Sequence, residues 1–359
     1  MRALNFTAGP CTLPVEILED VQSEFLDFHD SGASIVELSH RGTEIEGIVA
    51  EANASLRAAY DIPSDFDILF LQGGATLQFS MVPMNLLVPG RRASYVITGA
   101  WSEAAFNDAR VYGDAQAAWT ADDSALKRVP LASELRVSPT DRYLHIASNE
   151  TIGGVAFGEL PWVGVPLVVD ASSDFLARPL PWDLVDVVYA GAQKNVGPAG
   201  VTIVIVRHSI LPETRKDIGS YLSLEQQVSK GGMLNTPPVF SIYLMSKMLR
   251  WIQEHGGAVA MAVEAEAKSK LIYSVVDSSH GFYRCPVEIN SRSKVNVIVN
   301  LESVQLEKEF LKAAEQEGML GLAGHRSVGG VRASMYNAMT LNGVRNLRDF
   351  MIEFSKVRS

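Results

Sequence analysis

Short apolar runs rich in valine and isoleucine alternate with longer segments of helical period between residues 66 and 207. Several of these runs are apolar throughout, as strands must be when a sheet is covered on both faces. The alternation predicts an α/β domain with a mostly parallel sheet, whose functional residues gather at the carboxyl ends of the strands. The expected strands cover residues 67–71, 93–98, 142–147, 166–170, 185–190 and 201–206.

The chain changes character after Trp251, where the sequence HGG (255–257) ends one helix and an alanine-rich amphipathic stretch begins at Ala258. We therefore expect a large domain over residues 16–256 and a smaller C-terminal α/β domain over residues 257–359. The smaller domain is predicted to contain a strand at 295–301, a helix at 305–317, a strand near Val331 and a final helix from Leu341.

Composition excludes several classes of protein. The formal net charge of −10 argues against a partner that is a nucleic acid, because such proteins present a dense basic face to phosphates. No run approaches the roughly 20 apolar residues that span a bilayer, and the N-terminus lacks the apolar run of a signal peptide. The two cysteines cannot form a disulfide framework and lack metal-ligand spacing, so we expect a cytoplasmic protein without a metal site.

Asp170 and Lys194 are the residues most suggestive of chemistry. Asp170 ends one predicted strand and Lys194 follows the next, in the sequence AGAQKNVGPAG, where glycines and a proline hold the lysine in a loop at the sheet edge. A partly desolvated lysine can form a Schiff base with an aldehyde, and a carboxylate can keep a pyridine nitrogen protonated. The pair fits pyridoxal 5′-phosphate (PLP) chemistry. An ordinary loop lysine and a capping aspartate remain the alternative from these two residues alone.

Three other predicted strand ends carry groups that could bind a ligand. The sequence QGGATLQF places Ala75 and Thr76 at a helix N-terminus, whose free N–H groups favour an anion such as a cofactor phosphate. Trp101 could stack on a flat heteroaromatic ring, and Thr151 offers a hydroxyl. The alternatives are a plain tight turn, a core tryptophan and a turn or cap residue, respectively.

Basic residues gather in two short glycine-bearing loops. One contains His40 and Arg41 and the other contains His325 and Arg326, with Arg332 shortly after. Arginine grips carboxylates and phosphates bidentately, and a neighbouring histidine adds a donor that can be charged near neutral pH. These clusters predict clamps for an anionic substrate, while a solvated surface remains the alternative for either pair.

Taken together, the motifs resemble the phosphoserine aminotransferase family, whose members are class V, fold-type I PLP enzymes. The resemblance covers nearly the whole chain. It rests on FTAGPCTLP (6–14), SIVELSHRG (34–42), LQGGATLQFSMVPMNLL (71–87), AGAQKNVGPAG (190–200), NTPPVFSIY (235–243) and GHRSVGGVRASMYNAMTLNGVRNLRDFM (324–351). The last motif separates phosphoserine enzymes from other class V members. The resemblance implies a fold-type I PLP transferase with a seven-stranded sheet, in which residues 1–15 join the small domain.

The same resemblance implies a role for each site residue. Lys194 is the Schiff-base lysine, Asp170 pairs with the pyridinium nitrogen, Trp101 stacks on the ring and Thr151 lines the pocket. It also implies that Arg332 binds the substrate α-carboxylate. The cofactor phosphate is then held by Ala75, Thr76 and Gln193, with Asn235 and Thr236 from the second subunit of a homodimer; the substrate phosphate is surrounded by His40, Arg41, His325 and Arg326. Some family members have an arginine where Thr76 stands, so this chain departs from them there.

The implied reaction transfers an amino group from L-glutamate to 3-phosphonooxypyruvate, giving O-phospho-L-serine for serine biosynthesis and 2-oxoglutarate. A related phosphorylated substrate, 4-phosphooxy-L-threonine of pyridoxine biosynthesis, would fit the same anion clamps. The alternatives are another class V enzyme, such as an alanine:glyoxylate or serine:pyruvate aminotransferase, and a noncatalytic α/β binding module that has kept the fold.

Overall fold

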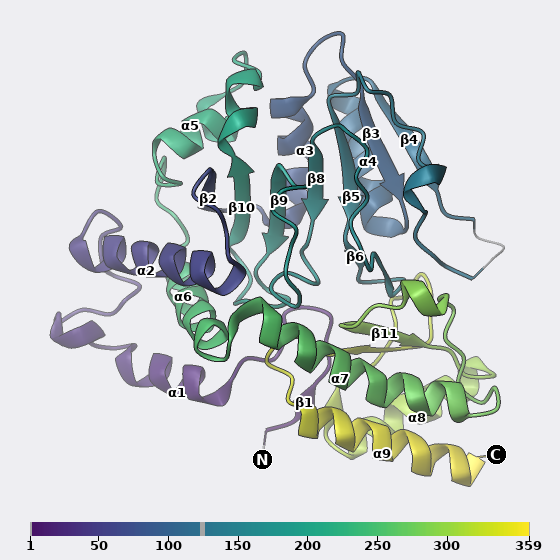
Figure 1. Ribbon diagram of the computed structural model, residues 1–359. Helices are drawn as coiled ribbons and strands as arrows, with labels where there is room; N and C mark the ends of the chain where they lie inside the picture. Colours follow the sequence, from purple (N-terminus) through teal and green to yellow (C-terminus); the bar gives the residue numbers. More distant parts are fainter. Residues whose placement is uncertain (1, 123–125, 359) are drawn as a thin grey trace.

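The centre of the protein is a seven-stranded sheet, seen in a computed structural model that describes residues 2–122 and 126–358 (Figure 1). Its spatial order is β2 (Phe66–Leu71), β10 (Thr202–Arg207), β9 (Val187–Gly191), β8 (Leu167–Asp170), β5 (Tyr143–Ala147), β3 (Ala93–Ile97) and β4 (Ala115–Thr120). Strand β10 runs antiparallel to both of its neighbours, whereas the four remaining strand pairs are parallel. The prediction of a mostly parallel sheet is therefore confirmed.

All six predicted strands are present, with ends that differ by one or two residues from expectation. The seventh strand, β4, was not predicted. Its sequence AQAAWT contains three alanines, which are poor strand formers, and only Ala118 is buried. It forms because pairing with β3 satisfies its backbone at the edge of the sheet.

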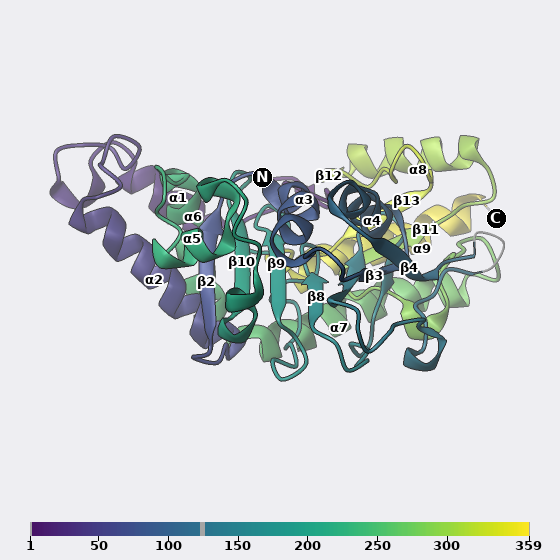
Figure 2. The same ribbon diagram turned by 90° about the horizontal axis from the view of Figure 1, so that it is seen from above.

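Helices cover both faces of this sheet. One face packs against α3 (Gly74–Leu86), α4 (Ala100–Tyr112) and α5 (Leu224–Ser229), and Figure 2 shows α3 and α4 side by side there. The other face packs against α2 (Thr43–Tyr60) and α6 (Val239–Glu254), which α1 (Val15–Glu24) joins. Successive residues of β9 enter the two layers in turn, because side chains alternate along a strand. This double cover explains why the central strands read as continuous apolar runs.

A second hydrophobic core lies beside the carboxyl edge of the sheet. It contains Phe6 and residues between 272 and 354. Strand β1 (Leu4–Asn5) pairs with β12 (Met319–Leu320), so the N-terminus joins this core. Its other elements are α7 (Gly257–Ser278), β11 (Asn296–Val299), α8 (Val304–Gln316), β13 (Val331–Ser334) and α9 (Leu341–Arg358). The strands and helices predicted at 295–301, 305–317, Val331 and Leu341 are therefore confirmed.

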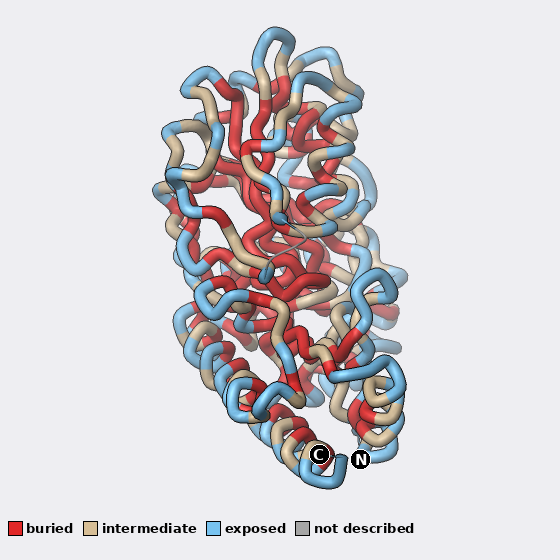
Figure 3. Tube along the Cα trace, turned by 90° about the vertical axis from the view of Figure 1, so that its right-hand side faces the viewer, coloured by how far each residue is buried: buried red, intermediate tan, exposed pale blue. Residues whose placement is uncertain are grey.

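Helix α7 connects the two cores. Its first turns place Ala258 and Met261 in the core of the large sheet, and its later turns place Ile272 and Val275 in the second core. Figure 3 shows the buried part of the trace running down the middle of the molecule from one core toward the other. None of the helices in the described part of the chain is both long and apolar enough to cross a membrane.

Candidate active site

The carboxyl ends of β3, β5, β8 and β9 meet at one edge of the sheet, because these strands are parallel. Helix α4 begins just after β3, the short strand β6 (Asn149–Glu150) follows β5, Asp170 ends β8, and the loop of Lys194 follows β9. This edge faces the second core (Figure 1). The topology alone therefore brings four segments of distant sequence to one place.

Lys194 occupies the middle of this group. Its Nζ donates a hydrogen bond to Thr151 Oγ1 at 2.7 Å and lies 5.6 Å from the ring centroid of Trp101. Burial lowers the pKa of the Lys194 amine, the carboxylates of Asp170 and Glu150 oppose this shift, and the charge of Arg332 adds to it. A lowered pKa increases the fraction of free amine, which is the nucleophilic and basic form.

Asp170 is the acid beside this amine, with 6% of its surface exposed. Its Oδ1 accepts the backbone N–H of Ser172 at 2.9 Å. Burial raises the pKa of the Asp170 carboxyl, while the Lys194 charge and the hydrogen bonds from Ser172 lower it. Tyr189 pairs with Asp170 across the two strands, and its hydroxyl is 2.8 Å from His145 Nε2. Asp170 thus has polar neighbours within an otherwise apolar layer.

A glycine turn joins β2 to α3. Gly73 and Gly74 have φ angles of 94° and 69°, which are left-handed values that favour glycine. A Cβ on Gly73 would lie 2.5 Å from Leu77, so the turn has no room for a side chain there. Ala75 and Thr76 lie in the first turn of α3, where free N–H groups can hold an anion.

The N-terminal segment reaches the loop of Lys194. The backbone N–H of Cys11 donates to the carbonyl of Gln193 at 2.9 Å. The Gln193 side chain folds against its own loop, since its Oε1 lies 2.7 Å from the position that a Cβ on Gly191 would take. The segment that belongs to the second core therefore closes over the lysine loop of the first.

Arg332, on β13 of the second core, also reaches this group. Its Nη1 donates to the carbonyl of Thr151 at 3.4 Å, and its buried Nε has no hydrogen-bond partner among the described residues. Burial lowers the pKa of the guanidinium, and the charge still persists because arginine stays protonated in proteins. A guanidinium with a free donor suits a carboxylate ligand. Trp101 Nε1 is likewise buried without a partner among the described residues.

Six of the predicted site residues lie outside this group, and no hydrogen bond or ion pair within the described part of the chain joins them to Lys194, Asp170 or Arg332. These residues are His40, Arg41, Asn235, Thr236, His325 and Arg326. The Thr236 carbonyl accepts from Gln72 Nε2 at 3.1 Å, and both Asn235 and Thr236 are exposed. His325 Nδ1 is 2.7 Å from Ser327 Oγ.

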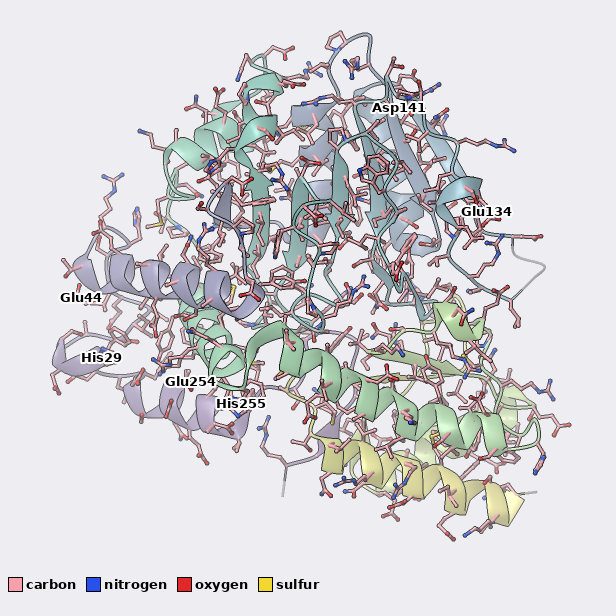
Figure 4. All side chains as sticks on the ribbon, in the orientation of Figure 1. His29, Glu44, Glu134, Asp141, Glu254 and His255 are labelled. Atoms are coloured by element: carbon pink, nitrogen blue, oxygen red, sulfur yellow. The ribbon has the colours of Figure 1, made fainter. Side chains whose placement is uncertain are left out.

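The loop of His40 and Arg41 is remote from the lysine within one chain. It precedes α2, an 18-residue helix whose other end packs Tyr60 against Phe175, with ring centroids 5.0 Å apart. At 1.5 Å per residue, the two ends of α2 are about 25 Å apart. Figure 4 shows Glu44, in the first turn, at the outer end of the molecule. Within a single chain this loop therefore lies away from the carboxyl edge of the sheet.

Sequence reasoning missed Glu150. This fully buried acid precedes Thr151 and accepts hydrogen bonds from the first turn of α4. Its position after a buried strand was visible in the sequence, but an acid there is usually interpreted as a surface residue. Only the structure reveals that Glu150 is enclosed.

The residues at this edge fit PLP. Lys194 provides an amine of lowered pKa, Asp170 a buried carboxylate, and Trp101 an indole whose N–H lacks a partner among the described residues. The glycine turn before α3 adds N–H groups for a phosphate. The described residues contain no cluster of three or more histidine, cysteine, aspartate or glutamate side chains that could hold a metal ion.

Comparison with known proteins agrees with this interpretation. The family model described as aminotransferase class-V matches residues 3–347, so the fold and the site define a PLP-dependent aminotransferase of class V. The phosphoserine aminotransferases of Laribacter hongkongensis and Niallia circulans are 48% and 46% identical to the chain, over 99% of each chain in both pairs. The chain belongs to the phosphoserine aminotransferase family.

Solved structures of that family are similar over the whole chain. The phosphoserine aminotransferase from Bacillus circulans subsp. alkalophilus is 45% identical, with a TM-score of 0.97 and coverage of 100% of this chain and 99% of that one. The PLP-bound phosphoserine aminotransferase from Trichomonas vaginalis is 34% identical, with a TM-score of 0.94 and coverage of 98% and 100%. The prediction of a fold-type I PLP enzyme is thus confirmed, and its cofactor is PLP.

Proposed function

We propose that this chain transfers an amino group from L-glutamate to 3-phosphonooxypyruvate, forming O-phospho-L-serine and 2-oxoglutarate. The observation that carries the proposal is the meeting of Lys194, Thr151 and Arg332, which brings a reactive amine and a carboxylate-binding guanidinium together from two cores. The names of the relatives supply the substrate class. The phosphorylated substrate 4-phosphooxy-L-threonine fits the same proposal.

We assign the cofactor-binding roles as follows. Lys194 forms the Schiff base, Asp170 pairs with the pyridinium nitrogen, and Trp101 stacks on the ring. Thr151 holds the lysine Nζ. The phosphate is held by Ala75, Thr76 and Gln193, with Asn235 and Thr236 from a second copy of the chain.

Substrate recognition requires one pocket for two different diacids. Arg332 binds the α-carboxylate that both share, using the Nε that lacks a partner among the described residues. The remaining basic residues, His40, Arg41, His325 and Arg326, bind either the substrate phosphate or the side-chain carboxylate of glutamate. Some relatives have an arginine where Thr76 stands. Because Thr76 is neutral, the substrate phosphate meets one arginine fewer here than in those relatives.

PLP, when bound, supplies an aldehyde that accepts the amino group and a ring that withdraws electrons from the substrate Cα. Lys194 would act as the base whose free amine carries the proton between the substrate Cα and C4′ of the cofactor, in one direction in each half-reaction. Thr151 orients Nζ through the 2.7 Å hydrogen bond, and the lowered pKa increases the fraction of unprotonated amine. Asp170 holds the proton on the pyridine nitrogen.

We also propose a homodimer in which each active site takes groups from both copies. The loop of His40 and Arg41 precedes Glu44 at the outer end of α2, and Asn235 and Thr236 are exposed, which supports their use by a partner. We divide the chain into a large domain (16–256) and a small domain (257–359 with 1–15), supported by the two cores and the β1–β12 pair. A cytoplasmic location suits an enzyme of amino-acid biosynthesis with two free thiols.

The test is the visible absorption spectrum of the purified protein during titration with O-phospho-L-serine and then with L-serine. We expect a yellow protein whose visible band is bleached by O-phospho-L-serine at far lower concentration than by L-serine, and Lys194→Ala to lack the lysine-bound band. An equal response to the two amino acids would move the assignment to another class V aminotransferase. A protein that stays colourless with added PLP would refute the assignment as a PLP-dependent enzyme.

A further inference from the structure

Glu150 is a fully buried acid to which the proposed reaction gives no role. Its Oε1 accepts the backbone N–H of Ser102 at 2.9 Å and the Ser102 hydroxyl at 2.6 Å, and its Oε2 accepts the backbone N–H of Trp101 at 3.2 Å. These donors belong to the first turn of α4, whose N–H groups have no partner within the helix. One carboxylate from a remote segment therefore holds this turn.

The fit of the Glu150 carboxylate against α4 is tight. A Cβ built on Gly99, the residue before the helix, would lie 2.7 Å from Glu150 Cδ and 2.9 Å from Oε2. No residue with a Cβ could therefore occupy position 99 without displacing the carboxylate. Burial raises the pKa of the Glu150 carboxyl, and the hydrogen bonds from Ser102 and Trp101 lower it. The helix dipole also favours the ionised form at this end.

The segment that carries Glu150 links the first turn of α4 to Lys194. Thr151, the next residue, accepts the hydrogen bond from Lys194 Nζ. Asn149, the residue before, donates 2.8 Å hydrogen bonds to Ser173 Oγ and to Asn296 Oδ1. The three residues are buried and anchored on both sides. Their consecutive positions fix the spacing between the first turn of α4 and the lysine amine.

Trp101 is the residue that this spacing controls. It lies in the turn held by Glu150, and its ring centroid is 5.6 Å from Lys194 Nζ. The indole packs at a tilt against Phe79, with ring centroids 6.4 Å apart. Since its Nε1 has no partner among the described residues, the hydrogen bond from its backbone N–H to Glu150 provides the polar anchoring of this residue.

We propose that Glu150 is a positioning residue, which holds the first turn of α4 so that the Trp101 indole faces the cofactor ring at the correct distance from Lys194. This inference rests on the proposed function, because it takes Trp101 to stack on the ring. Glu150 itself touches neither cofactor nor substrate. We therefore assign its effect on ring stacking to Trp101, separately from the effect of its charge on the pKa of the Lys194 amine.

The experiment measures the affinity of pyridoxamine 5′-phosphate for the full-length apoprotein by calorimetry. This probe carries an amine in place of the aldehyde, so it cannot form a Schiff base with Lys194 and its affinity reports noncovalent contacts alone. The variants are Trp101→Ala, Glu150→Ala, the double variant and Glu150→Gln. Glu103→Gln is the matched control, because Glu103 is an exposed acid in the same turn. Circular dichroism of the bound probe reports the orientation of its ring.

We expect Trp101→Ala and Glu150→Ala each to weaken binding by about 10-fold, the size of a lost ring stack. The double variant should bind as Trp101→Ala does, since residues that act through one another are not additive. Glu150→Gln keeps the acceptor for Ser102 but turns N–H groups toward the Trp101 amide, so it should lose roughly 3-fold. Glu103→Gln should leave both the affinity and the dichroism unchanged.

Other outcomes separate this inference from the proposed function. If Trp101→Ala weakens binding but Glu150→Ala and Glu150→Gln do not, the positioning role is wrong and the proposed function stands. Additive losses in the double variant would also overturn it. If the wild-type protein fails to bind the probe, both proposals are wrong. Should Glu150→Ala fail to fold, Glu150→Gln and Ser102→Ala, each alone and combined with Trp101→Ala, decide the same question.

Discussion

The charge on Lys194 depends on residues that approach it from several elements. Burial lowers the pKa of its amine, Asp170 and Glu150 raise it from β8 and β6, and Arg332 lowers it from β13. No single neighbour therefore fixes the protonation state. A change that removes one of these charges should alter both the reaction rate and its dependence on pH.

Asp170→Asn tests this balance. The neutral amide cannot hold a proton on the pyridine nitrogen, so we expect the variant to keep its cofactor while kcat falls by on the order of 10²–10³-fold. Because the Asp170 charge raises the pKa of Lys194, its removal should lower the pH at which the free lysine amine titrates. Steady-state rates and a pH titration of lysine reactivity in the apoprotein measure the two effects.

Asp183→Asn is the control for Asp170→Asn. Asp183 is exposed, so this substitution removes the same charge from the surface of the protein. It should keep the wild-type rate and lysine titration. A wild-type kcat in Asp170→Asn would contradict the assignment of Asp170 to the pyridine nitrogen. A lower rate with an unchanged lysine titration would leave the cofactor role but refute the effect on the amine.

At the scale of elements, the connection between the two cores depends on α7 and on a buried lysine within it. Lys268 is 1% exposed, and its Nζ donates to the carbonyls of Tyr336 at 2.9 Å and Met339 at 3.0 Å. Those carbonyls belong to the turn between β13 and α9. Burial lowers the pKa of Lys268 from 10.5 to about 8. The hydrogen bonds of Lys268 thus join the helix to the turn, while burial disfavours the charged form of its amine.

This shift makes stability depend on pH in a defined window. Between about pH 8 and 10.5 the unfolded chain binds more protons at this lysine than the folded chain does, so the free energy of unfolding rises with pH. The rise should approach about 3 kcal/mol. Urea unfolding of the apoprotein should show it as a growing difference between wild type and Lys268→Met, since the variant lacks the titrating group.

Lys270→Met provides the comparison for Lys268→Met, because Lys270 is exposed on the same helix. It removes a lysine without removing the buried contacts of Lys268, and other titrating groups cancel because all three proteins share them. A difference between wild type and Lys268→Met that does not change with pH would mean that Lys268 titrates normally in the folded protein.

The sequence predicted which segments form strands and helices better than it predicted which elements and side chains contact one another. Apolar runs revealed the strands that are covered on both faces, but β4 lies at the edge, where pairing with β3 replaces burial as the driving force. Because the central strands are parallel, their carboxyl ends meet, so the grouping of Lys194, Thr151 and Asp170 was predictable. The enclosure of Glu150 was not, because it depends on how closely α4 approaches β6 in three dimensions.

At the scale of the whole molecule, part of the predicted site lies away from the Lys194 of the same chain. The loop of His40 and Arg41 lies at the outer end of α2, and Asn235 and Thr236 are exposed. In a two-fold symmetric dimer, residues that project away from one active site can complete the other. We therefore expect Arg41 to act in the active site that contains the partner's lysine.

Mixing two inactive variants tests this arrangement. Lys194→Ala lacks the lysine and Arg41→Ala lacks the arginine that we propose binds the substrate anion, so each homodimer should be nearly inactive. In a mixed dimer, the intact Lys194 of one chain meets the intact Arg41 of the other, which restores one site of two. Random exchange makes half of the dimers mixed, so co-refolding equal amounts should recover about one quarter of wild-type activity.

The control mixes Lys194→Ala with Arg332→Ala, because Arg332 contacts Thr151 of the same chain. In that mixed dimer each site lacks one required residue, so no activity should return. Recovery in the Arg41 mixture and not in the Arg332 mixture would require that Arg41 crosses the interface while Arg332 does not. If neither mixture recovers although mixed dimers are detected by mass spectrometry, Arg41 serves the site of its own chain and its loop must move toward Lys194 on substrate binding.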